Sequence, residues 1–185
     1  MMILKFILSC LYLFLPAYFT NMASSLIKKH KFLNFLDKPI DSGKKFCGQP
    51  IFGSHKSWRG AIFGIVIGFL VAFSQKFLYQ FPTIQKISFL DYQKINIYLF
   101  GFLICFGAIF GDLLFAFIKR RLKLEPGARF FPFDQTNYVI GAAIVLSPFF
   151  KIKIEVWITI FILTFFLHII INWVGYLLNL HKCRW

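Results

Sequence analysis

The sequence predicts an all-α integral membrane protein with about five transmembrane helices and two cytoplasmic motif loops. Of its 185 residues, 58% are hydrophobic, and the mean hydropathy is +0.70. Soluble domains contain nearer half apolar residues. No long polar stretch remains between the apolar runs, so residues 1–185 are predicted to form a single transmembrane domain.

Five apolar segments account for the predicted helices, because a bilayer core of about 30 Å takes about 20 helical residues to cross. The first segment lacks a strongly basic leading region and a small-residue cleavage site, which favours an uncleaved helix over a signal peptide. The fourth segment is short and is the weakest of the set. The predicted spans are residues 3–22, 61–81, 95–118, 138–150 and 154–180.

Basic residues gather in the two loops that connect these spans, residues 23–60 and 119–137. The chain has 21 Lys and Arg against 7 Asp and Glu, a formal net charge of +14. In a soluble protein this charge would suggest nucleic acid as a partner, but no nucleic-acid-binding pattern is present. The positive-inside rule places both loops and the C-terminal tail in the cytoplasm and the N-terminus outside, in the plasma (inner) membrane.

Asp112 and Asp134 are the candidate metal ligands. Asp112 precedes Lys119 by seven residues, about 10 Å along a helix, so it lies within the apolar zone. An ionised carboxylate there should face protein, water or a cation. Two converging carboxylates suit Mg²⁺, which keeps some waters and takes substrate phosphates as further ligands. Structural alternatives remain open: an ion pair of Asp112 with Lys119 or Arg120, and a turn or helix-cap role for Asp134.

The first loop is the candidate binding site for a phosphorylated ligand. Residues 55–60 read His-Lys-Ser-Trp-Arg-Gly, and Lys56, Ser57 and Arg59 stand at a helix start, where free backbone N–H groups favour anions. Several glycines leave the loop backbone exposed, as phosphate cradles require. No Walker sequence is present, and no Ser-His-Asp or Cys-His arrangement indicates covalent hydrolysis.

Other polar residues have simpler interpretations. The basic run at residues 119–121 also fits snorkelling anchors at a helix end. The four cysteines form no Cys-x-x-Cys pair and indicate neither a zinc site nor a disulfide framework. His168 and Asn172 in the fifth span are interpreted as interhelical hydrogen-bonding groups.

Together these motifs resemble those of the CDP-archaeol synthase family, archaeal CTP:lipid-phosphate cytidylyltransferases related to the phosphatidate cytidylyltransferases. The similarity runs from about Asp37 to Gly141. It rests on Pro39-Ile-Asp41, Gly48, Phe52-Gly53, His55-Lys-Ser-Trp-Arg-Gly60, Gly111-Asp112, Phe117-Ile-Lys-Arg-Arg121 and Pro132-Phe-Asp-Gln135.

The resemblance implies a membrane nucleotidyltransferase that converts CTP and a lipid phosphate into a CDP-lipid and pyrophosphate with Mg²⁺. The lipid phosphate would be phosphatidate-like or an isoprenoid glycerol phosphate. The resemblance implies that Asp112 and Asp134 hold the metal and that Lys119 joins them as a catalytic residue. It also implies that CTP and its phosphates are bound by Asp41, Lys56, Ser57, Arg59, Lys119, Arg120 and Gln135.

This chain departs from the family pattern at four positions. Ala116 stands where serine is frequent, Asn137 replaces a usual aspartate, and Cys47 and Ser54 replace residues that are commonly Arg and Asp. We expect Asn137 to weaken a second metal site. Two other functions remain as alternatives: a small membrane transporter of an anionic solute, and a non-catalytic membrane scaffold whose basic loops dock on anionic lipid.

Overall fold

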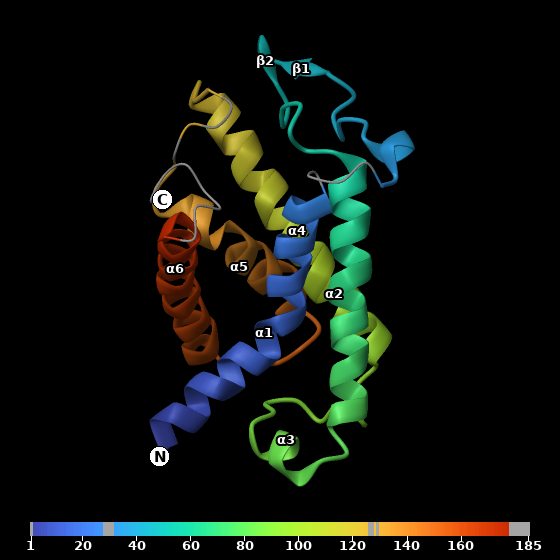
Figure 1. Cartoon of the computed structure of the whole chain (residues 1–185), viewed down its shortest axis with the longest axis vertical. Helices are drawn as coiled ribbons and strands as arrows, with labels where there is room; N and C mark the ends of the chain where they lie inside the picture. The colour runs from blue at the N-terminus through green and yellow to red at the C-terminus, as the bar shows by residue number, and fades with distance from the viewer. Residues whose placement is uncertain (1, 28–31, 126–127, 129, 178–185) are drawn as a thin grey trace.

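The structure is a computed structural model that describes residues 2–27, 32–125, 128 and 130–177. It confirms the all-α membrane fold class: long helices lie side by side along the molecule, with one small hairpin at an end (Figure 1). The elements are α1 (Met2–Leu26), η2 (Asn34–Leu36), β1 (Lys45–Phe46), β2 (Gln49–Pro50), α2 (Trp58–Leu78), α3 (Pro82–Lys86), α4 (Ile97–Arg121), α5 (Phe133–Leu146) and α6 (Ile154–Leu177).

Four of the described helices are long and apolar enough to cross a membrane: Met2–Leu26, Trp58–Leu78, Ile97–Arg121 and Ile154–Val174. α5 has 14 residues, about 21 Å at 1.5 Å per residue. It begins at Phe133, five residues before the expected segment, because polar residues from Asp134 to Asn137 form its first turns and hydropathy alone leaves them out. It ends at Leu146, before Pro148.

The buried core lies where α1, α4, α5 and α6 meet. Phe14 of α1 stacks on Tyr138 of α5, with ring centroids 6.0 Å apart, and meets Trp157 of α6 edge-on at 6.3 Å. Phe100 of α4 is fully buried in the same cluster. These large side chains fill the middle of the bundle, together with a few buried uncharged polar residues such as Thr20 and Thr164.

The polar residues of the last span include a pair within one helix. Asn172 and His168 of α6 bond to each other at 3.0 Å. This pairing lies within α6, so their interpretation as interhelical groups is wrong for this bond.

α4 and α5 cross at glycines, which lets their backbones come unusually close. A Cβ added to Gly141 would lie 2.3 Å from both the carbonyl oxygen of Gly107 and the backbone nitrogen of Gly111. One added to Gly111 would lie 2.2 Å from the carbonyl oxygen of Asn137. Small residues at a helix crossing are the usual way for membrane helices to approach each other. This crossing brings Asp112, the next residue of α4, against the first turns of α5.

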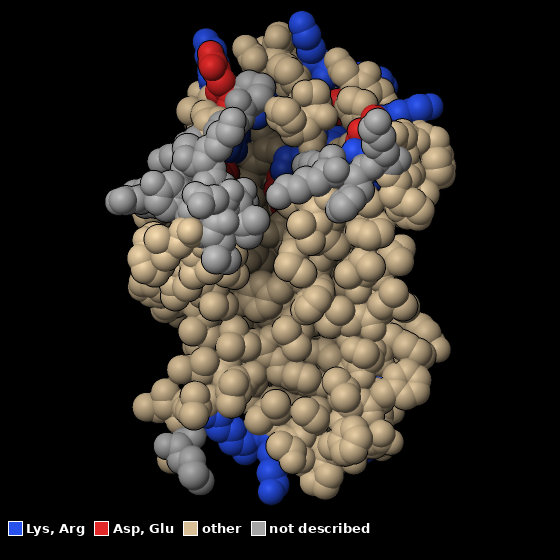
Figure 2. Space-filling view, viewed as in Figure 1, with Lys and Arg blue, Asp and Glu red and all other residues tan. Residues whose placement is uncertain are grey.

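Charged residues separate to the two ends of the molecule and leave an uncharged middle. Figure 2 shows Lys, Arg, Asp and Glu gathered at the end that carries the hairpin, a few lysines at the other end, and other residue types between them. A hollow near the hairpin end exposes both basic and acidic atoms. That distribution fits a bilayer-spanning bundle with a polar site at one end.

Candidate active site

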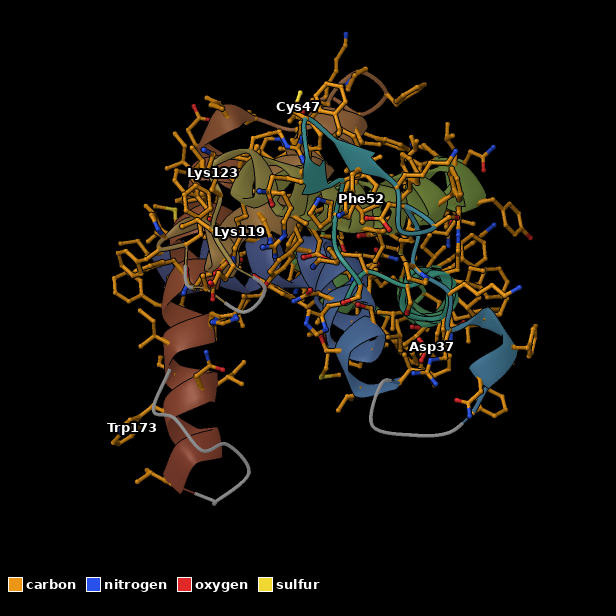
Figure 3. The ribbon with its side chains drawn as sticks, turned by 90° about the horizontal axis from the view of Figure 1, so that it is seen from above. Asp37, Cys47, Phe52, Lys119, Lys123 and Trp173 are labelled. Atoms are coloured by element: carbon orange, nitrogen blue, oxygen red, sulfur yellow. The ribbon has the colours of Figure 1, made fainter. Side chains whose placement is uncertain are left out.

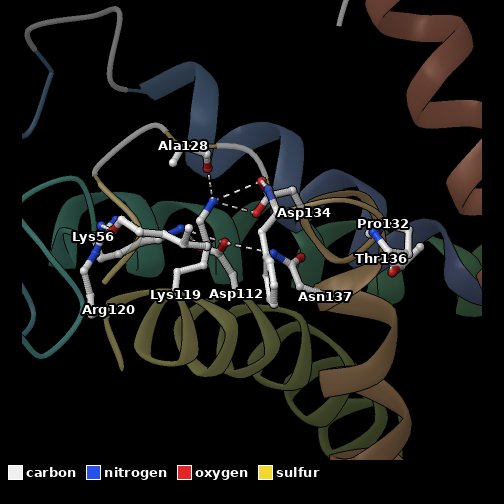
Figure 4. A network of polar contacts seen from close by, with 11 residues as sticks. Lys56, Asp112, Lys119, Arg120, Ala128, Pro132, Asp134, Thr136 and Asn137 are labelled. Atoms are coloured by element: carbon white, nitrogen blue, oxygen red, sulfur yellow. Dashed lines mark hydrogen bonds and ion pairs between the residues drawn. The ribbon is translucent and has the colours of Figure 1, made fainter. Parts of the chain in front are cut away.

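Two ion pairs between lysines and aspartates form the centre of the site (Figure 4). Lys56, from the loop before α2, donates to both carboxylate oxygens of Asp112 on α4, at 2.6 Å each. Lys119, near the end of α4, donates to both oxygens of Asp134 on α5, at 2.9 and 3.0 Å. The sequence suggested Lys119 or Arg120 as the ion-pair partner of Asp112 in a purely structural role. In the structure its partner is Lys56 instead.

The two pairs share one end of the α4–α5 crossing. Asp112 and Lys119 lie seven residues apart on α4, and Asp134 and Asn137 lie three apart on α5, so each couple occupies one helix face. The amide nitrogen of Asn137 reaches Asp112 at 3.4 Å and links the two helices. The structure thus brings together both predicted metal ligands and Lys119. The sequence did not predict the contact of Asn137 with Asp112, because Asn137 was considered only as a replacement of the aspartate that is usual in the family.

Backbone groups fix Asp134 further. Its carboxylate accepts a hydrogen bond from the backbone N–H of Phe130, at 2.8 Å, and Lys119 also donates to the carbonyl oxygen of Ala128. The carboxylate therefore closes the turn that leads into α5. The turn role considered for Asp134 is therefore present and coexists with the ion pair to Lys119. The helix-cap role is not, because α5 begins without a side-chain cap.

A small pocket lies beside the Lys56–Asp112 pair, between the C-terminal end of α1, the loop before α2, and α4. Its volume is about 20 Å³, and its walls include Ser24, His55, Ser57 and both members of the ion pair. A cavity of this size holds about one water molecule.

Asp41 and Arg59 have structural partners within the first loop. Asp41 accepts hydrogen bonds from the backbone N–H groups of Gly43, Phe52 and Gly53, at 2.9 to 3.0 Å. Burial raises the pKa of this carboxyl, but the three hydrogen bonds outweigh burial and hold the pKa below its usual value. Arg59, only 5% exposed, donates to Asn34 and forms an ion pair with Asp37.

Ser57 caps α2, because its side chain accepts from the N–H of Gly60 at 3.4 Å. Such a cap satisfies one of the free donors at a helix start. The loop that carries Lys56 is therefore held in shape by Asp41, Ser57 and Arg59. Viewed from above, Asp37 and Phe52 of this loop and Cys47 at the hairpin tip spread over the helix ends, with Lys119 beside them (Figure 3).

The two arginines after Lys119 behave differently. Arg121 donates to the carbonyl oxygens of Phe46, Gln49 and Pro50 and lies over the rings of Phe46 and Phe117, at 5.2 and 4.9 Å. It fastens the β1–β2 hairpin to the end of α4 and is more than a snorkelling anchor.

Arg120 is 8% exposed and donates to the carbonyl oxygen of Leu124. Its Nε is buried with no hydrogen-bond partner among the described residues, as is Oε1 of Gln135. Such groups are costly unless a ligand or water satisfies them. Both residues were predicted to contact phosphate, and Arg120 Nε is an unused donor of the kind that a phosphate would take.

The donor set fits a divalent metal that takes oxygen ligands. Two carboxylates from two helices stand close to the amide of Asn137, and in this structure ammonium groups supply the positive charge that a metal would bring. The described residues contain no group of three or more His, Cys, Asp or Glu side chains placed to hold a metal. Mg²⁺ needs no such cage, because it retains waters and uses substrate phosphates.

Fold and site together define an all-α membrane protein with a carboxylate–lysine cluster at one end of its helix bundle. Residues 3–185 match the model of the CarS-like CDP-archaeol synthases. The chain belongs to this family, and it is a membrane-embedded cytidylyltransferase. The family also confirms the resemblance in the motifs. Enzymes of this kind are generally metal-dependent.

Individual relatives match over nearly their full length. The CDP-archaeol synthase of Archaeoglobus fulgidus is 35% identical, over 98% of this chain and 99% of the relative. That of Pyrobaculum islandicum is 34% identical over 95% and 98%, and that of Methanocaldococcus jannaschii is 32% identical over the whole of both chains.

The fold also matches a solved structure, described as an intramembrane enzyme for archaeal membrane lipids biosynthesis. The TM-score is 0.68 at 21% identity, and the match covers 88% of this chain and 91% of that chain. At this identity the likeness concerns the fold alone.

Proposed function

We propose that this enzyme transfers the CMP group of CTP to a lipid phosphate, which gives a CDP-lipid and pyrophosphate. The observation that carries the proposal is the α4–α5 crossing, which gathers Asp112 and Asp134 beside two lysines at one end of a membrane bundle. Family membership supports this function over the transporter and the scaffold. A phosphate monoester is already anionic, so its attack on the α-phosphorus needs positioning and charge neutralisation rather than a general base.

The two lysines are proposed to exchange partners when substrate binds. Each ammonium now neutralises one carboxylate, and Lys56 also closes a pocket with room for about one water. Triphosphate oxygens, like carboxylate oxygens, are ionised acceptors that form charge-assisted hydrogen bonds with lysine. Lys56 and Lys119 would therefore turn to phosphate, and Asp112 and Asp134 would become free to bind Mg²⁺, which neutralises charge on the phosphates.

The remaining candidates complete the phosphate contacts. The unused Nε of Arg120 is proposed to donate to a phosphate oxygen. Ser57, Gln135, Arg59 and Asp41 stand in or beside the same loops, and for the last two we propose that they hold the backbone that meets CTP, because their charged groups are already paired.

The basic residues also support an orientation. The hairpin end carries the lysine and arginine clusters of both motif loops, so the positive-inside rule places this end in the cytoplasm and the start of α1 outside. In the proposed inner-membrane setting the site would then face cytoplasmic CTP. Lys182 and Arg184 of the tail lie outside the described residues.

The direct test combines the purified protein in detergent with CTP, MgCl₂ and either a diacyl or an isoprenoid ether glycerol phosphate. CDP-lipid should form, and EDTA should abolish its formation. Asp112→Asn should lower kcat by about a hundredfold or more. Asp91→Asn is the matched control, because Asp91 pairs with Lys94 outside the site. Full activity in Asp112→Asn would reject the assigned metal role.

A further inference from the structure

The chain between α1 and α2 exposes large aromatic side chains. Phe32 and Phe35 are 62% and 70% exposed, and η2, which contains Phe35, has no buried residue. Trp58, the first residue of α2, is 48% exposed. Residues 32–38 are called the aromatic turn below. Several large apolar side chains exposed close together mark an interaction surface.

The aromatic turn is fastened to the first turn of α2. Arg59, which is buried, donates to the side-chain oxygen of Asn34 at 2.7 Å and forms an ion pair with Asp37 at 2.9 Å. The backbone N–H of Trp58 donates to the carbonyl oxygen of Lys38 at 3.0 Å. The three exposed rings therefore belong to two segments that are bonded directly to each other.

The turn lies on the outside of the helix bundle. Figure 1 shows it in blue beside the upper end of α2, on the side away from α6. Seen from above, Asp37 of the turn and Trp173 of α6 lie at opposite sides of the molecule (Figure 3). α2 is long and apolar enough to cross a membrane from Trp58 to Leu78. Its first turn, and the aromatic turn beside it, therefore lie where a bilayer meets water, the level at which tryptophan is enriched.

The unpaired charge of the same loop is positive. Lys38, Lys44 and Lys45 are exposed, and none of them forms an ion pair with a carboxylate among the described residues. The two aspartates of the loop are already held, Asp37 by Arg59 and Asp41 by backbone N–H groups. Lysines next to exposed aromatic rings are the combination that binds a bilayer surface rich in anionic lipid.

We propose that the aromatic turn docks on the bilayer surface, with its exposed rings at the boundary between headgroups and acyl chains and with Lys38 on the phosphates of anionic lipids. Apolar rings gain free energy by leaving water, and phosphate oxygens form charge-assisted hydrogen bonds with lysine. The N–H of Ile40 donates to the carbonyl oxygen of Lys56 at 2.8 Å, so the docked turn also holds the loop that carries Lys56. This docking is independent of the reaction that the enzyme performs.

A nitroxide label at position 35 measures the depth of the turn. Phe35→Cys is combined with Cys47→Ser and Cys183→Ser, so the remaining cysteines are Cys10 and Cys105, both fully buried. The protein is studied in vesicles of phosphatidylcholine and phosphatidylglycerol. Oxygen concentrates in lipid and a neutral nickel chelate in water, so the ratio of oxygen to nickel collisions rises with depth. This ratio should be higher at position 35 than at native Cys47, which is exposed on the hairpin.

Two outcomes of this measurement would overturn the inference. One is an equal collision ratio at the two positions, which would place the turn in water. The other is shielding of position 35 that disappears when the protein is diluted in lipid, because a second copy of the chain would then cover the turn.

Trp58 reports which lipid lies against the turn. Bromine on a lipid chain quenches tryptophan by contact, and the difference between wild type and Trp58→Phe isolates this residue from the other tryptophans. Brominated phosphatidylglycerol should be preferred over brominated phosphatidylcholine there by about fivefold, the value of one lysine near an anionic surface. Lys38→Gln should remove most of this preference.

Lys94→Gln is the matched control, because Lys94 is also exposed but pairs with Asp91 away from the aromatic turn. This variant should keep the preference for phosphatidylglycerol at Trp58. Absence of quenching at Trp58, equal affinity for the two lipids, or an equal loss of preference in Lys94→Gln would each refute the docking on anionic lipid.

Discussion

Gly141→Ala tests whether the α4–α5 crossing sets the geometry of the site. The new Cβ would lie 2.3 Å from the carbonyl oxygen of Gly107 and 2.4 Å from Cα of Gly111. Ordinary contacts begin at 3.4 Å, and the difference from 2.3 Å requires the two helices to separate by about 1 Å. All three contacting atoms belong to the backbone of α4, so no side-chain rotation can relieve the clash.

That separation acts directly on the residues of the candidate site. Asn137 already reaches Asp112 at 3.4 Å, so a further ångström breaks the contact and moves the two carboxylates apart. Misplacement of about 1 Å at a reacting centre costs about a hundredfold in rate. Overpacking itself costs about 1–3 kcal/mol of stability. We therefore expect kcat for CDP-lipid formation to fall about a hundredfold at a temperature where the variant remains folded.

Gly68→Ala is the matched control for overpacking away from the site. Its Cβ would clash with Thr20 and the carbonyl oxygen of Pro16 on α1, at 1.9 and 2.6 Å, and with Sγ of Cys105 on α4, at 2.6 Å. It would therefore push α2 from α1 and α4 rather than α4 from α5. Both variants should lose stability in thermal unfolding, but only Gly141→Ala should lose rate. A kcat for folded Gly141→Ala within threefold of the wild type would refute the claim that this crossing positions the carboxylates.

Three further results are expected. The lowered pKa of Asp41 makes its contribution to stability complete above the unfolded value of about 3.9, and this contribution is lost as the pH falls through the folded value. Asp41→Asn should therefore flatten the dependence of Tm on pH below about pH 4, and an unchanged slope there would contradict this. Arg121→Ala should free the hairpin at residues 45–50, which limited proteolysis would detect as faster cleavage there than in Arg121→Lys. A double-mutant cycle of Tyr18→Phe and Thr164→Val should give a coupling of about 0.6 kcal/mol between α1 and α6, and zero coupling would mean that their hydrogen bond contributes nothing.

Hydropathy was enough to predict the fold class, and charge pointed to Asp112 and Asp134 as candidates for the site. Long apolar runs require helices in a bilayer, because every backbone N–H and C=O must be satisfied within the segment. An aspartate inside such a run must meet a counter-charge, and Asp112 does so through Lys56. Hydropathy did not predict that α5 begins as early as Phe133, because its first turns are polar.

The sequence could not predict which lysine pairs with which aspartate, because these ion pairs depend on which helices are in contact. Local spacing relates Asp112 to Lys119 on one helix, yet the structure joins Asp112 to Lys56, 56 positions away, and Lys119 to Asp134. The loop residues show the same limit. Asp41 looks like a ligand in sequence, but its oxygens meet backbone N–H groups that only the folded loop brings near.

The amino-acid sequence by itself determined that this chain is a helical membrane protein with acidic and basic groups suited to a phosphorylated substrate, because solvation in a bilayer depends on composition and segment length. The tertiary structure alone decided how those groups meet. Glycines 107, 111 and 141 have no side chains to hold α4 and α5 apart, and that close contact converts scattered aspartates and lysines into one site.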